Sequence, residues 1–167
     1  SVRDGTAYVL TNTDFLTFDV TEPSAPVQLG SLEPPSQGND FVLAGDYAYA
    51  VHNGGIFVID VSDPTGPFIA GSAAAADWPD EIAIDRNILF TAGSFGVMHV
   101  FDISNPMSPI EIGSVTVDGP VATLTTWNGL VLAPMGGAGL HVFAPCDLLF
   151  RDGFESGGSS RWSADVP

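Results

Sequence analysis

The sequence predicts an all-β fold built from β-propeller blades of four antiparallel strands each. Three observations predict it. One phrase recurs around Asp19, Asp60 and Asp102, at spacings of 41 and 42 residues. Short runs rich in β-branched and aromatic residues flank each copy, and tight polar turns separate the runs. About three and a half such blades fit into the 167 residues, so we expect an arc that is part of a larger ring.

The recurring phrase reads FDVTEPSAP, FVIDVSDPTGP and FDISNPMSP. The prolines end the strand, because proline has no N–H to donate to a sheet. The aspartate carboxylate is expected to accept hydrogen bonds from free N–H groups of the turn. The repeated turn residues are Asp19, Pro23, Pro26, Asp60, Pro64, Pro67, Asp102, Pro106 and Pro109. A glycine follows each aspartate by eleven residues, at Gly30, Gly71 and Gly113.

The strands of each repeat follow from its apolar runs. The third strand precedes the turn, as FLTFDV, IFVIDV and VMHVFDI, and the fourth follows it, as PVQLGSL, PFIAGSA and PIEIGSV. The first two strands are NDFVLAG and DYAYAVHN in the second repeat, DEIAIDR and NILFTAG in the third, and PVATLTTW and GLVLAPM in the fourth. Residues 1–4 are expected to end an inner strand of the first repeat. Because the runs are apolar on both alternating sides, we expect sheets buried on both faces, as in stacked blades.

The stretch GDYAYAVHNGGIFVIDVSDPTGPFIAGS resembles the LVIVD repeat, a β-propeller repeat of bacterial and archaeal cell-surface proteins. The resemblance extends over residues 1 to about 144. It implies an extracellular or cell-surface location and no shared catalytic chemistry. We therefore divide the chain into LVIVD-type repeats at residues 1–145 and a C-terminal tail at residues 146–167.

The fourth repeat departs from the pattern, because Ala144 stands where the aspartate should be and APCDLLF replaces the proline turn. An arc of this size leaves its end sheets open. We expect the missing blades to come from a longer chain or from a second copy. The longer chain is the preferred interpretation, because Ser1 falls within a strand and the sequence lacks an initiator methionine.

The tail is rich in glycine, serine and acidic residues. Its motif DGFESG…W resembles a C-terminal segment of secreted bacterial proteins, and also the opening strand of jelly-roll carbohydrate-binding modules. The first resemblance fits better, because too few residues remain to build such a module. Alternatively, Phe154 and Trp162 pack onto the last blade.

The excess of acidic residues limits the classes of partner that the chain can bind. The chain has 20 acidic residues, four arginines and no lysine, with a net charge of −16. Such a surface repels phosphate backbones and anionic lipid, so we expect no nucleic acid and no bare membrane as partner. No apolar run approaches the roughly 20 residues of a membrane span. The single cysteine, Cys146, cannot form an internal disulfide.

Two loops hold the candidate ligand-binding residues, and both should lie on one face of the propeller. The turn HNGG contributes His52 and Asn53, and the loop AAAADWPDE contributes Asp77, Trp78, Asp80 and Glu81. An aromatic platform among carboxylates suits sugars or cationic groups. The acids could instead serve as the carboxylate pair of glycoside hydrolysis, or bind Ca²⁺, although no D-x-D-x-D-G loop is present. In the simplest alternative, Trp78 packs between blades and the acids are merely solvated.

No residue is assigned a catalytic or metal-binding role. The sequence has no Gly-x-Ser-x-Gly turn, Cys146 has no nearby histidine, and His99 and His141 recur at one strand position as expected of packing residues. We therefore expect a non-enzymatic binding scaffold that meets a protein or glycan at its loop face. The alternatives are a propeller hydrolase or lyase that uses Asp80 and Glu81, and a purely structural spacer.

Overall fold

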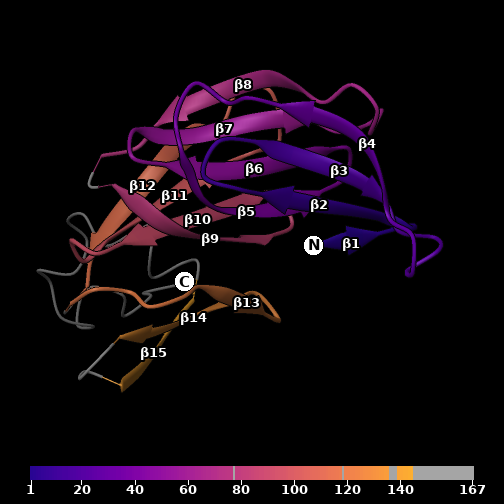
Figure 1. The fold of residues 1–167 in the computed structure, drawn as a ribbon. Helices are drawn as coiled ribbons and strands as arrows, with labels where there is room; N and C mark the ends of the chain where they lie inside the picture. The colour runs from indigo at the N-terminus through magenta and orange to yellow at the C-terminus, as the bar shows by residue number, and fades with distance from the viewer. Residues whose placement is uncertain (77, 118, 136–138, 145–167) are drawn as a thin grey trace, which may run out of the picture.

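The computed structural model describes residues 1–76, 78–117, 119–135 and 139–144, and these ranges form fifteen strands without a helix (Figure 1). The strands make four antiparallel sheets, each from strands consecutive in the sequence. The first sheet has β1 (Val2–Arg3), β2 (Thr6–Leu10), β3 (Phe15–Asp19) and β4 (Val27–Leu32). The second has β5 (Gly38–Ala44), β6 (Tyr47–His52), β7 (Gly55–Asp60) and β8 (Phe68–Ala74). The third has β9 (Pro79–Asp85), β10 (Ile88–Gly93), β11 (Val97–Asp102) and β12 (Ile110–Thr116), and the fourth has β13 (Thr125–Trp127), β14 (Leu130–Met135) and β15 (Gly139–Phe143).

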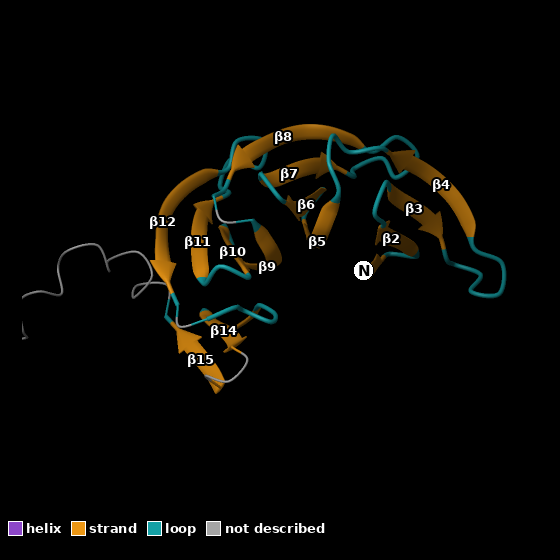
Figure 2. Ribbon diagram, turned by 60° about the vertical axis from the view of Figure 1, so that its left-hand side comes forward, coloured by secondary structure: helices purple, strands orange, loops and turns teal. Residues whose placement is uncertain are grey.

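The sheets stand side by side like the blades of a fan (Figure 2). Strands β4, β8 and β12 lie along the outer rim, and the first strands of the sheets gather on the inner side. This arrangement confirms the prediction of propeller blades with four strands per repeat, with residues 2–3 as an inner strand. The inner strand of the fourth sheet is shorter than the expected PVATLTTW. Ahead of β13, the Ala122 N–H donates instead to the Pro134 carbonyl (3.0 Å), and Val121 and Leu124 turn into the core.

Three hydrophobic cores fill the spaces between neighbouring sheets. Tyr8 and Phe15 of the first sheet pack with Ala48, Ala50 and Ile59 of the second. The opposite side of the second sheet packs on the third through Tyr49, Val51, Ile56 and Val58 against Ile82, Leu89, Phe101 and Ile103. The third core joins the third and fourth sheets and includes Phe90, Met98, Val100, Val131, Ala133 and Met135. The middle sheets are therefore buried on both faces, as their apolar sequences predicted.

The recurring aspartates hold the turns at the rim. Asp60 Oδ1 accepts hydrogen bonds from the Ser62 N–H (2.9 Å) and the Ser62 hydroxyl (2.6 Å). Asp19 accepts the same two bonds from Thr21, at 2.9 Å and 2.6 Å. The Asp102 carboxylate accepts the Ser104 N–H at 2.7 Å. The expected side-chain cap is thus present in all three turns.

Each outer strand contains a β-bulge just before the recurring glycine. The register shifts between Thr17 and Phe18, between Val58 and Ile59, and between Val100 and Phe101, on the strands that pair with β4, β8 and β12. A β-bulge bends a strand and increases its twist. In the first two sheets the glycine beside the bulge then meets the proline turn of the next sheet. A Cβ atom at Gly30 would lie 2.6 Å from the Pro64 carbonyl oxygen.

Candidate binding site at the loop face

The side chain of Asn39, at the start of β5, links the two loops that the sequence singled out. Its amide nitrogen donates to Asn53 Oδ1 (3.2 Å), to the Pro79 carbonyl (3.0 Å) and to Asp80 Oδ1 (3.3 Å). The turn between β6 and β7 therefore lies beside the start of β9. The geometry brings Asn53 and Asp80 onto one surface, although they belong to different sheets.

Trp78 forms an exposed aromatic pair with Phe95, from the turn between β10 and β11. The two rings meet edge to face, with centroids 5.9 Å apart and planes at 88°. The side chains remain 59% and 63% exposed, so Trp78 is not buried between blades. Trp78 also has a φ of +47°, a conformation that bulky residues rarely adopt and that often marks functional segments.

Asp80 lies directly beside the aromatic pair. Its carboxylate accepts a hydrogen bond from the Ser94 hydroxyl (2.9 Å), which belongs to the same turn as Phe95, and another from Asn39. Both neighbours therefore fix the orientation of this carboxylate at the loop face.

Glu81 points to the other side of β9, because successive strand residues alternate between faces. Burial raises its pKa, and the nearby carboxylate of Asp40 raises it further. The Thr123 hydroxyl and the Leu124 N–H oppose this effect by hydrogen bonding to the carboxylate. Since Asp80 faces the second sheet and Glu81 faces the fourth, the two do not present one shared acid–base pair.

His52 is half-buried and makes three contacts within its own blade. Its ring stacks on Phe57, with centroids 4.0 Å apart and an angle of 6°. Its Nδ1 accepts from the Gly54 N–H (3.1 Å) and lies 3.0 Å from the Ser36 hydroxyl. Burial lowers the pKa of His52. Asn53 is exposed beside it, and Asp77 lies outside the described residues.

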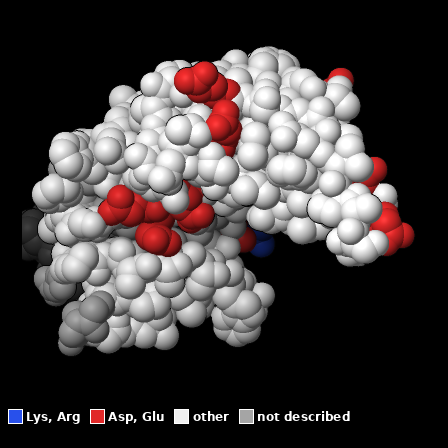
Figure 3. All heavy atoms as spheres, viewed as in Figure 1, with Lys and Arg blue, Asp and Glu red and all other residues white. Residues whose placement is uncertain are grey.

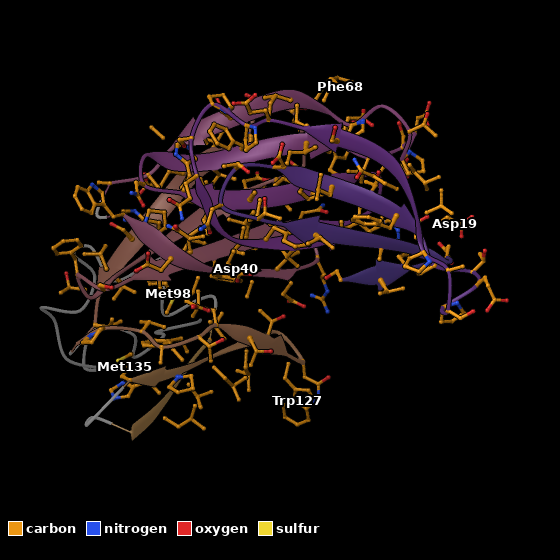
Figure 4. All side chains as sticks on the ribbon, in the orientation of Figure 1. Asp19, Asp40, Phe68, Met98, Trp127 and Met135 are labelled. Carbon is orange, nitrogen blue, oxygen red and sulfur yellow. The ribbon has the colours of Figure 1, made fainter. Side chains whose placement is uncertain are left out.

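A patch of carboxylates lies near these loops. Figure 3 shows acidic side chains gathered where the third and fourth sheets meet, and Figure 4 places Asp40 there. In the described part of the chain, no group of three or more His, Cys, Asp or Glu side chains is placed to hold a metal ion, so no ligand set can be named for Ca²⁺. The described residues also contain no helix with the length and apolar character of a membrane span.

The two histidines at the recurrent strand position pack within the sheets. His99 is 5% exposed, and its Nδ1 lies 2.9 Å from Glu111 Oε1. His141 pairs with Ala133, on the side of the fourth sheet that faces the third. These positions agree with the predicted packing role.

Sequence reasoning missed three contributors to this surface: Phe95, Asn39 and Ser94. Asn39 and Ser94 are ordinary polar residues, and only the fold brings them to Asp80. Phe95 did carry a signal. A phenylalanine in the middle of a tight Ser-Phe-Gly turn cannot reach a strand core, so exposure could have been predicted.

Comparison with known families identifies two repeats. The family described as LVIVD repeat matches residues 37–74 and 80–117. These ranges follow the second sheet, β5 to β8, and the third, β9 to β12. The repeat unit and the structural blade therefore coincide. No match was found among the curated proteins.

Solved structures with a similar fold include designed and natural proteins. The computationally designed Ika8 protein is 11% identical with a TM-score of 0.70, over 86% of this chain and 44% of that chain. The designed Ika4 protein is 13% identical with a TM-score of 0.66, over 86% and 87%. The WD40 domain of Pan2 from Neurospora crassa is 10% identical with a TM-score of 0.70, over 87% and 45%. The chain thus spans less than half of two of these structures, and the likeness establishes the propeller fold.

Proposed function

We propose that this chain, a β-propeller segment with two LVIVD repeats, is a non-enzymatic scaffold that binds a partner at its loop face. The single observation that carries the proposal is the exposed Trp78–Phe95 pair beside the Asp80 carboxylate. Large exposed aromatics are the side chains that most often dominate binding energy at protein interfaces. Here they stand on turns that connect the strands of the third sheet to their neighbours, and binding residues are found on such loops disproportionately often.

The chemistry of this surface favours a partner that combines an apolar or planar group with a positive charge. Aromatic faces attract cations and stack on planar groups, and the neighbouring carboxylates add a favourable Coulomb interaction. A segment of a protein that carries arginine or lysine meets both requirements. A glycan would use the aromatic faces and the carboxylates as hydrogen-bond acceptors, and is the second partner to test.

An extracellular or cell-surface location belongs to the same proposal. Its supports are the resemblance to cell-surface LVIVD proteins, the acidic and lysine-free composition, and the DGFESG…W motif. Protease treatment of intact cells that produce the protein tests the location. Protection of the chain from the external protease would contradict it.

The binding test uses two defined probes, an arginine-containing peptide with one tyrosine and a neutral chito-oligosaccharide. We expect saturable binding of the peptide by calorimetry, weakened at least about tenfold by Trp78→Ala or Phe95→Ala, as for hot-spot aromatics. Phe68→Ala is the matched control, because Phe68 is 54% exposed on the outer strand β8. Equal binding by Trp78→Ala and the unaltered chain would reject the site. Binding of only the sugar would replace the protein partner by a glycan.

A further inference from the structure

Among residues 1–76, 78–117, 119–135 and 139–144, none packs over one face of the first sheet. The pairing of Val2 with Ala7, Ala7 with Phe18, and Val9 with Leu16 puts these five residues on the same side. The opposite side of the sheet, with Tyr8 and Phe15, packs on the second sheet. We call the five residues the first end face. Val2 is 68% exposed and Val9 is 39% exposed.

One face of the fourth sheet is likewise left uncovered by the described residues. The pairing of Trp127 with Leu130, Leu132 with Val142, and Pro134 with Leu140 puts six residues on the side away from the third sheet. Together they form the last end face. Trp127, Leu140 and Val142 are 65%, 59% and 52% exposed. Figure 4 shows Trp127 on the side of β13 away from β9.

Both end faces repeat positions that are buried at the internal junctions. Aligned on the repeat, Leu132, Pro134, Leu140 and Val142 correspond to Tyr49, Val51, Ile56 and Val58, which pack the second sheet against the third. Ala7, Val9 and Phe18 correspond to Ala48, Ala50 and Ile59, which receive the first sheet. The last end face is therefore the type that docks on a following blade, and the first end face is the type that receives a preceding blade.

The composition of the two faces and the length of the arc both fit a contact between two copies. Neither contains a charged residue, so their contact would bury no unpaired charge. The chain aligns with 44% of Ika8 and 45% of the Pan2 WD40 domain, each at a TM-score of 0.70. Two such arcs amount to nearly the length of one of those chains. Soluble monomers rarely leave large apolar patches exposed.

We propose that the end faces are ring-closing interfaces and that their occupant is a second copy of this chain. The last end face of each copy docks on the first end face of the other. One two-fold axis then relates the copies, and both junctions close at once. This proposal does not depend on the ligand proposed for the loop face.

Light scattering of the purified chain over a range of concentrations tests the proposal. We expect twice the mass of one chain, which is 17.4 kDa. Val2→Asp on the first end face and Leu140→Asp on the last should each weaken the dimer at least tenfold, because either change breaks a junction. Phe68→Asp is the control and should remain dimeric, since Phe68 lies on the rim strand β8.

The variants are chosen to keep the single chain folded. Val2 and Leu140 are both largely exposed in one chain, so an aspartate there removes no internal contact of the core. Circular dichroism checks that each variant keeps the strand content of the parent. A wild-type monomer at all concentrations overturns the proposal. So does a dimer that neither variant weakens, or an open series of growing oligomers.

Discussion

The backbone carbonyl of Met107 lies directly against Gly71, so that no side chain fits between them. Gly71 belongs to the outer strand of the second sheet, and Met107 belongs to the proline turn of the third. One blade earlier, Gly30 makes the equivalent contact with the carbonyl oxygens of Pro64 and Thr65. The recurring glycine and the recurring proline turn are therefore two halves of one contact between neighbouring blades.

Gly71→Ala is expected to lower the free energy of unfolding by about 1–3 kcal/mol, the usual cost of forcing extra atoms into a packed site. A methyl group at this position would overlap the backbone oxygen of Met107, and backbone cannot swing aside as a flexible side chain can. Urea denaturation measures the change. Gly66→Ala is the matched control, because a Cβ atom at Gly66 meets nothing within 4 Å. Equal stability of the two variants would show that the contact does not constrain the blades.

The architecture could be predicted from the sequence because several independent features recur together in three repeats. An aspartate, two prolines and a glycine at fixed offsets, between apolar runs, are compatible with few folds other than stacked blades. The length of β13 could not be predicted, because it depends on how Val121 and Leu124 reach the core of the third junction. The role of the glycines was also hidden, since their partner atoms belong to the next repeat.

The candidate site was predictable only in outline. Trp78, Asp80 and Asn53 stand in loops that the repeat places on one face, so their meeting followed from topology. The residues that hydrogen-bond to them could not be predicted from topology. Asn39 joins Asn53 to Asp80 across two sheets, and no local pattern marks an asparagine for that task. The stacking of His52 on Phe57 could not be predicted either, because it depends on the pairing of β6 with β7.

Asp102→Ala is expected to destabilise the third proline turn at neutral pH. Hydrogen bonds from the Ser104 N–H and hydroxyl lower the pKa of the Asp102 carboxyl. A lowered pKa in the folded state means that the stabilisation is present above the unfolded pKa of about 3.9 and is lost as the pH falls through the folded value. The melting temperatures of parent and variant should therefore converge below about pH 4.

Asp102→Asn separates the contribution of the hydrogen bond to stability from that of the negative charge. An asparagine oxygen can still accept the Ser104 N–H, so this variant should retain more stability than Asp102→Ala at pH 7. A difference between parent and Asp102→Ala that stays constant from pH 7 to pH 3 would contradict the role of the ionised carboxylate.

Glu81→Gln is expected to stabilise the chain at neutral pH. Burial, with help from Asp40, raises the pKa of the Glu81 carboxyl, so ionising Glu81 costs more free energy in the folded chain than in the unfolded one. The destabilisation is absent below the unfolded pKa of about 4.3 and develops as the pH rises through the folded value. Thermal melts should therefore show the variant above the parent at pH 7 and equal to it near pH 3.

Asp40→Asn tests the cause of the Glu81 shift. Removing the neighbouring negative charge should move the pKa of Glu81 toward its ordinary value, as followed by NMR titration of the side-chain carbonyl. An unchanged Glu81 titration in Asp40→Asn would mean that the carboxylate of Asp40 does not raise the pKa of Glu81.

His52→Asn is expected to make the chain less sensitive to acid between pH 7 and pH 5. Burial lowers the pKa of His52, so the folded chain favours the neutral ring, whose Nδ1 accepts the Gly54 N–H. The stabilisation from a lowered histidine pKa is complete above the unfolded value of about 6.5 and is lost as the pH falls below it. An asparagine can accept the same N–H two residues ahead and does not titrate in this range. The melting temperature of the parent should therefore fall relative to His52→Asn on acidification. Parallel pH profiles for the two proteins would show that the protonation of His52 is not coupled to folding, and that its stacking on Phe57 tolerates the charged ring.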